Sequence, residues 1–137
     1  MKDPTELMNR LTDTGETDAM RESLSAWENL TPEIIEDTVA WIDGKRQHLL
    51  SLINDVEDPE MLEESFAVQY IEFKSTWMSL NTRLNFQMVK QGAPSNELVA
   101  RATTLSMLID IVDDYLKDED ITVINDFLAE QPTSRAA

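Results

Sequence analysis

Two clusters of carboxylates at helical spacing are the residues best suited to chemistry in this sequence. Residues three and four positions apart share one face of a helix, so each cluster would present its carboxylates together. Oxygen ligands of this kind suit Mg²⁺, the cofactor of a carboxylate–magnesium nucleotide phosphohydrolase. The clusters are an E-x-x-E-E pattern at Glu60, Glu63 and Glu64 and a D-x-x-D-D pattern at Asp110, Asp113 and Asp114.

Helix geometry argues against one metal site built from both clusters. If the chain turns near Ala93, Asp110 pairs with the neighbourhood of Thr76, and Glu63 then lies about 20 Å away along the helix. A single magnesium ion does not bridge that distance. We therefore predict no metal site, no cofactor and no catalytic residue, and keep the phosphohydrolase only as an alternative function.

Other enzyme chemistries lack the residues that they need. The chain has no cysteine, which excludes thiolate nucleophiles, iron–sulfur clusters and disulfides. Its one histidine, His48, follows Lys45 by three residues, so the E-x-x-H motif of diiron bundles is absent. No P-loop, dinucleotide-binding glycine pattern or G-x-S-x-G motif occurs either. We expect a protein that is not an enzyme.

The charge balance is strongly acidic. Twenty-seven Asp and Glu residues against eleven Lys and Arg residues give a net charge of −16 in 137 residues. Such a surface repels phosphate backbones and anionic lipids, so we expect no direct binding to nucleic acid or membranes. Both ends of the chain are acidic, and the candidate acidic surface near the C-terminal end consists of Asp110, Asp113, Asp114, Asp118, Glu119 and Asp120.

Three interpretations of the acidic surface remain open. It keeps the protein in solution, it docks a basic partner such as a nucleic-acid-binding protein, or it mimics nucleic acid. In the last case the chain would be a decoy that inhibits a DNA- or RNA-binding protein.

A window without acids lies between Phe73 and Asn96, where three cations accompany uncharged polar and aromatic residues. This composition is typical of a protein-binding face. The alternative is that the cations neutralise neighbouring helices, with Lys74 near Asp113 and Arg83 near Glu33 or Glu36. The predicted partner-binding residues are Lys74, Trp77, Met78, Asn81, Arg83, Asn85, Phe86 and Lys90.

Apolar residues recur at steps of three and four along most of the chain, which indicates an all-α fold. Short loops between long helices favour an antiparallel bundle of three long helices with short terminal helices packed on it. We predict a single helical domain over 1–131 and a disordered tail over 132–137. The predicted long helices cover 32–57, 59–91 and 95–117, and the short ones run from Pro4 to a stop at Gly15, from a cap at Thr17 to Leu30, and over 121–130.

The predicted helix over 59–91 is about 48 Å long, against about 39 and 34 Å for the other long helices. Its far end carries Leu84, Phe86, Met88 and Val89 and needs cover from the terminal helices or from a second copy, as in a homodimer. No signal peptide or membrane span is visible, so we expect a cytoplasmic protein. The function that we predict is a small acidic helical protein-binding protein: an adaptor, inhibitor or assembly factor.

Overall fold

The computed structural model describes residues 4–13, 15–93 and 95–130, which form helices and no strand. This confirms the all-α class. The predicted tail over 132–137 lies outside the described residues, and the 1–131 domain limits stay a prediction. The helices are α1 (Pro4–Thr12), α2 (Gly15–Ser25), α3 (Pro32–Asp55), α4 (Pro59–Gln91), α5 (Asn96–Asp113) and α6 (Asp118–Ala129).

Local capping signals set the ends of the two longest helices. The Thr31 hydroxyl accepts a hydrogen bond from the backbone N–H of Ile34 at 3.3 Å, and α3 begins at the next residue. The Asp58 carboxylate accepts one from the N–H of Glu60 at 3.0 Å, and α4 begins at Pro59. Gly92 ends α4 at φ 75°, a left-handed conformation that glycine adopts without strain.

Three other boundaries differ from those expected. Helix α2 begins at Gly15 rather than at a Thr17 cap, because the Asp13 carboxylate accepts a hydrogen bond from the Gly15 N–H at 2.9 Å. Helix α5 ends at Asp113, and Leu116 is buried in the turn that follows. Helix α6 then begins at Asp118, where three acids in its first turn favour a helix start.

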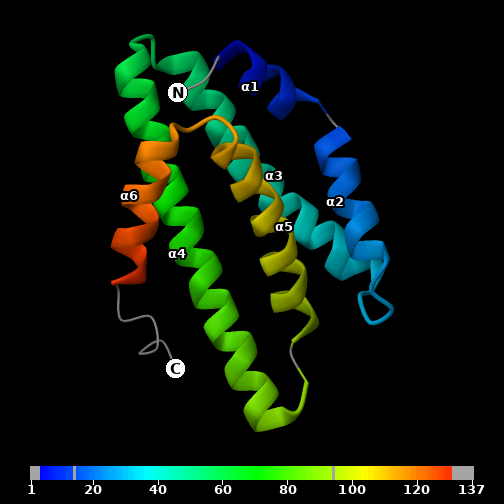
Figure 1. Cartoon of the computed structure of the whole chain (residues 1–137). Helices are drawn as coiled ribbons and strands as arrows, with labels where there is room; N and C mark the ends of the chain where they lie inside the picture. Colours follow the sequence, from blue (N-terminus) through cyan, green and yellow to red (C-terminus); the bar gives the residue numbers. More distant parts are fainter. Residues whose placement is uncertain (1–3, 14, 94, 131–137) are drawn as a thin grey trace.

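Helix α5 occupies the centre of the molecule. It runs alongside α4 in the opposite direction and also packs against α3 and α2 (Figure 1). Helices α3 and α4 contact each other little, because they diverge from their short connection. Half of the 18 residues of α5 are buried: Leu98, Ala100, Ala102, Thr104, Leu105, Leu108, Ile109, Ile111 and Val112.

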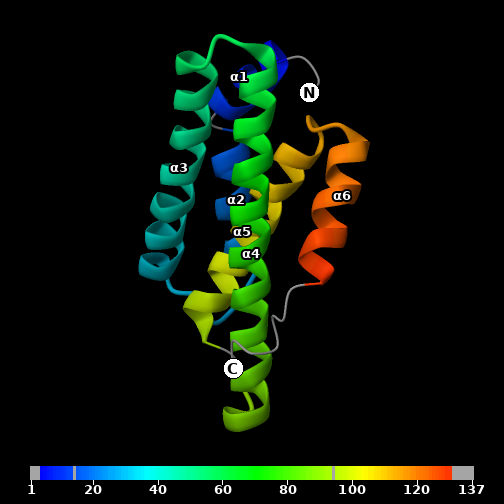
Figure 2. The same ribbon diagram turned by 90° about the vertical axis from the view of Figure 1, so that its left-hand side faces the viewer.

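The remaining helices cover the outside of this arrangement. Helices α1 and α2 pack along α3, and α6 packs on α4 (Figure 1). With 33 residues, α4 is about 50 Å long, whereas the 18 residues of α5 span about 27 Å. The last turns of α4 therefore project beyond the other helices, as Figure 2 shows. None of the described helices is both long and apolar enough to span a bilayer.

Candidate protein-binding surfaces

The first candidate surface is the distal end of α4, residues 83–91. Phe86 is 49% exposed and Val89 is 84% exposed, and Met88 is half-exposed. Met88 continues the apolar row of α4, but half of its surface remains exposed. Large apolar side chains are thus left in water at the end of the molecule that projects furthest.

The cations of this region are not neutralised by neighbouring helices. The ammonium of Lys90 lies 5.9 Å from the Phe86 ring centroid. Arg83 is exposed and forms no ion pair with any described residue. Its expected partner Glu36 instead binds the Arg21 guanidinium, with Arg21 Nε 2.9 Å from Oε2. Glu33, the other expected partner, forms no ion pair with any described residue. Arg83 is therefore paired with neither Glu33 nor Glu36 among the described residues.

Lys74, in contrast, lies nearer to the start of α4 than Arg83 and Lys90 do, and it is close to an acidic residue of α5. Its ammonium is 5.5 Å from the Tyr70 ring centroid. Burial raises the pKa of Asp113 above its usual value, and the nearby charge of Lys74 acts in the opposite direction. The expected proximity of Lys74 and Asp113 is therefore present, as an electrostatic contact.

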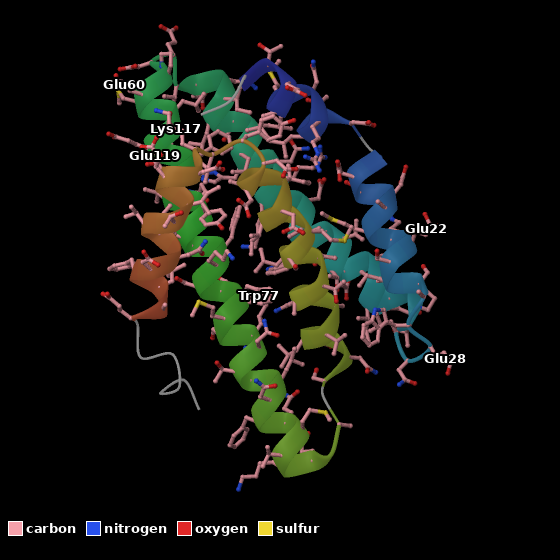
Figure 3. The ribbon with its side chains drawn as sticks, in the orientation of Figure 1. Glu22, Glu28, Glu60, Trp77, Lys117 and Glu119 are labelled. Carbon is pink, nitrogen blue, oxygen red and sulfur yellow. The ribbon has the colours of Figure 1, made fainter. Side chains whose placement is uncertain are left out.

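The predicted partner-binding residues divide along α4. Arg83, Asn85, Phe86 and Lys90 are exposed on the distal end. Trp77 and Met78 are half-buried against the hydrophobic core, and Figure 3 places Trp77 in the middle of the molecule. The Asn81 amide donates a hydrogen bond to the Trp77 carbonyl at 2.9 Å. Of the predicted partner-binding residues in this helix, these distal four are the ones that the structure leaves exposed.

The predicted acidic surface near the C-terminal end is interrupted. Asp114 binds Arg10 at 2.8 Å, and Asp113 is half-buried. A hydrogen bond to Glu63 raises the pKa of Asp120 above its usual value. Asp110, Asp118 and Glu119 are exposed. Half of the six carboxylates are thus engaged within the chain, whereas a nucleic-acid mimic needs a continuous row.

A second candidate surface, which we call the α4/α6 groove, lies between these two helices. It is a groove of about 440 Å³. Glu60, Glu64 and Asp120 lie at its acidic end, and Val68, Ile71 and Val123 are among its apolar lining residues. The sequence does not reveal it, because it depends on the turn after Asp113 that brings α6 back along α4. The sequence does offer one hint of this groove. Acidic residues gather near the starts of two helices, at Glu60 in α4 and at Asp118, Glu119 and Asp120 in α6.

A further group of aromatic and cationic residues lies where α3 faces α4 and α5. The Lys45 ammonium is 4.9 Å from the Trp41 ring centroid, and the Arg101 guanidinium carbon is 5.3 Å from the same ring. Lys45 and Trp41 also line a depression with His48 and Glu72. Lys45 and Glu72 carry opposite charges in this lining, so the depression has no excess of either sign.

The carboxylate clusters do not converge on a metal site. Within residues 4–13, 15–93 and 95–130, no group of three or more His, Asp or Glu side chains is arranged to hold a metal ion. Glu63 instead contacts the α5–α6 corner, with Lys117 Nζ 3.4 Å from its Oε1. No protein-family model, curated protein or solved structure matches this chain, so its function is argued from these surfaces.

Proposed function

We propose that this chain is a non-enzymatic protein-binding protein, an adaptor, inhibitor or assembly factor, that contacts its partner through the distal end of α4. The observation that carries the proposal is the exposure of Phe86 and Val89 on a helix end that projects beyond its neighbours. Exposed apolar patches of this kind are typical of protein interaction sites. We further propose that an antiparallel bundle of three long helices holds this end away from the core.

The charges of the distal end favour a particular partner chemistry. Arg83 and Lys90 have no carboxylate partner among the described residues, and no acid occurs between Phe73 and Asn96. A partner that surrounds an apolar patch with carboxylates would complement them. A two-fold homodimer through this end would instead place the cations of both copies close together. We therefore favour a different protein, in the cytoplasm, as the partner.

The two alternative functions receive less support. A decoy that mimics nucleic acid needs a row of free carboxylates, and Asp113, Asp114 and Asp120 interact within the chain. A magnesium phosphohydrolase needs the two carboxylate clusters in one site, and Glu63 contacts Lys117 rather than Asp110. The distal end of α4 is the better-supported functional surface.

Photo-crosslinking tests the proposal. A benzophenone amino acid replaces Phe86 in one variant and Trp27 in a control, because the two aromatic side chains are similarly exposed, at 49% and 51%. The full chain is then irradiated in cells of its own host. We expect a covalent adduct with another protein at position 86 that position 27 does not give.

A second pair of variants checks that the apolar surface carries the contact. With the crosslinker at Asn85, the change Val89→Ser should abolish the adduct, whereas Met61→Ser, at an exposed apolar position near the other end of α4, should not. Absence of an adduct at position 86, or equal adducts at 86 and 27, would overturn the proposal. An adduct only with a second copy of the chain would show that the homodimer is correct instead.

A further inference from the structure

The α4/α6 groove presents apolar side chains that the described part of the chain leaves uncovered. Val123 is 68% exposed, and Phe127, one turn further along the same face of α6, is 52% exposed. Val68 on the α4 wall is also half-exposed. Helix α6 packs mainly on α4, so nothing else in the described chain covers this side of the pair.

Carboxylates gather at one end of this groove. Glu60 and Glu64 are exposed and form no ion pair with any described residue, and Asp120 faces them from α6. The neighbouring Lys117 is held by Glu63. Figure 3 shows Glu60, Lys117 and Glu119 at the same end of the molecule, where α4 and α6 both begin. The groove is therefore apolar along its length and negative at one end.

The dimensions and direction of the groove restrict what fits it. The α4 wall from Glu60 to Ile71 is about 17 Å long, which matches three turns of a helix. An amphipathic helix contacts such a groove with apolar residues at positions i, i+4 and i+7. If the last turn of the bound helix lies at the acidic end of the groove, the partial negative charge at its C-terminus faces the partial positive charges at the N-termini of α4 and α6.

We propose that the α4/α6 groove binds an amphipathic helix of a protein partner, with Lys or Arg in the last turn of that helix. The occupant follows from charge complementarity: apolar residues face Val68, Ile71 and Val123, and the basic turn faces Glu60 and Glu64, whereas Asp120 is hydrogen-bonded to Glu63. This surface is separate from the distal end of α4. A chain that uses both surfaces would join two partner segments.

A synthetic peptide tests the proposal directly. The probe is a helical peptide of four turns with Leu at positions i, i+4 and i+7 and three Lys residues in its last turn, titrated into the full chain by calorimetry. One control peptide has the Lys residues in its first turn, and another has Glu in place of Lys. We expect the probe to bind with at least about tenfold higher affinity than the Glu peptide, and more tightly than the reversed one.

Matched charge variants separate the groove from general attraction to an acidic protein. The double variant Glu60→Gln with Glu64→Gln changes the net charge by the same amount as Glu22→Gln with Glu28→Gln. The second pair is exposed on the other side of the molecule (Figure 3). We expect the groove pair to weaken peptide binding at least about fivefold and the control pair less than about twofold, because only close charge pairs escape screening.

An apolar variant provides a second measurement. Val68→Ser with Val123→Ser should weaken binding, because both side chains line the groove, whereas Val89→Ser on the distal end should not. The proposal is overturned if the probe does not bind, if both charge pairs weaken binding equally, or if the reversed peptide binds as well. If the apolar variant does not fold, the surface carboxylate pair still decides the result. Crosslinking at position 86 tests the proposed function separately.

Discussion

Arg10 binds Asp114 across 104 positions of sequence, with Arg10 Nη1 2.8 Å from Asp114 Oδ2. The same guanidinium binds Glu16 through Nε, also at 2.8 Å. One side chain of α1 therefore contacts both the start of α2 and the end of α5. It secures the N-terminal helix to the central one, beside the buried side chains of Leu7 and Leu11.

The change Arg10→Gln removes both ion pairs. Because the guanidinium is partly exposed, we expect the free energy of unfolding to fall by only about 0.5–1 kcal/mol at low salt. The loss should shrink at about 0.5 M salt, where screening weakens the wild-type pairs. Urea denaturation at both salt concentrations measures this. A loss that does not depend on salt would show that packing of the side chain matters more than its charge.

Two glycines on the surface of the molecule should respond oppositely to alanine. Gly44 lies exposed inside α3, and a Cβ added there meets nothing within 4 Å. Gly44→Ala should therefore raise the free energy of unfolding by about 0.5–1 kcal/mol, because glycine is a poor helix former. Gly92→Ala should lower it by about 1–2 kcal/mol, since its φ of 75° strains an L-residue. Equal effects from the two variants in chemical denaturation would contradict this explanation.

Tyr70 is completely buried in the core, and within residues 4–13, 15–93 and 95–130 its hydroxyl meets no partner in good hydrogen-bond geometry. Burial raises the pKa of this hydroxyl above its usual value, although the nearby Asn125 side chain acts to lower it. Because a buried polar group without a partner costs free energy, Tyr70→Phe should raise the free energy of unfolding by about 1 kcal/mol. If urea denaturation instead shows that the free energy of unfolding falls by a similar amount, the hydroxyl forms a hydrogen bond in solution, for example to a bound water.

Asp113 gives the fold a predictable pH dependence. Because burial raises its pKa, the folded state holds this proton to a higher pH than the unfolded state does. Its contribution to stability is therefore fully present below the unfolded pKa of about 3.9 and is lost as the pH rises through the higher folded value. Asp113→Asn cannot ionise, so it should be more stable than the wild type at pH 7 and similar to it at about pH 3.

Urea denaturation at both pH values tests this, with the exposed Asp110→Asn as the control. We expect a smaller change in the control, because its carboxylate remains in water. A destabilised Asp113→Asn at pH 7 would show that attraction by Lys74 outweighs the cost of burial.

The long helices were predictable because their ends are set locally. Thr31 and Asp58 precede Pro32 and Pro59, and Gly92 follows the last turn of α4, so capping and proline geometry determine these boundaries. The end of α5 was not predictable in this way. Tyr115 and Leu116 continue the apolar pattern, but they are buried in a turn, and only the position of α6 against α4 explains why.

The candidate surfaces also differ in whether local sequence or long-range packing determines them. Val89 is exposed because α4 is longer than α5, which follows from residue counts alone. Trp77 packs against the core because it follows Phe73 by four residues and precedes Leu80 by three, so it shares their buried face of α4. The polar residues next to it in sequence lie on other faces and do not change this. The α4/α6 groove required the path of the chain after Asp113, which no local pattern contains.

The central position of α5 also has a consequence for protein synthesis. Leu24 and Leu30 form a small buried cluster with Val39 and with Ala100 of α5. The ribosome releases Leu24, Leu30, Val39 and the fourth cluster member Ile35 long before Ala100. The finished α2 and α3 therefore expose this cluster until residues 96–113 emerge. The N-terminal half of the chain therefore needs either fast completion or a chaperone, and a truncated chain that stops before α5 should aggregate.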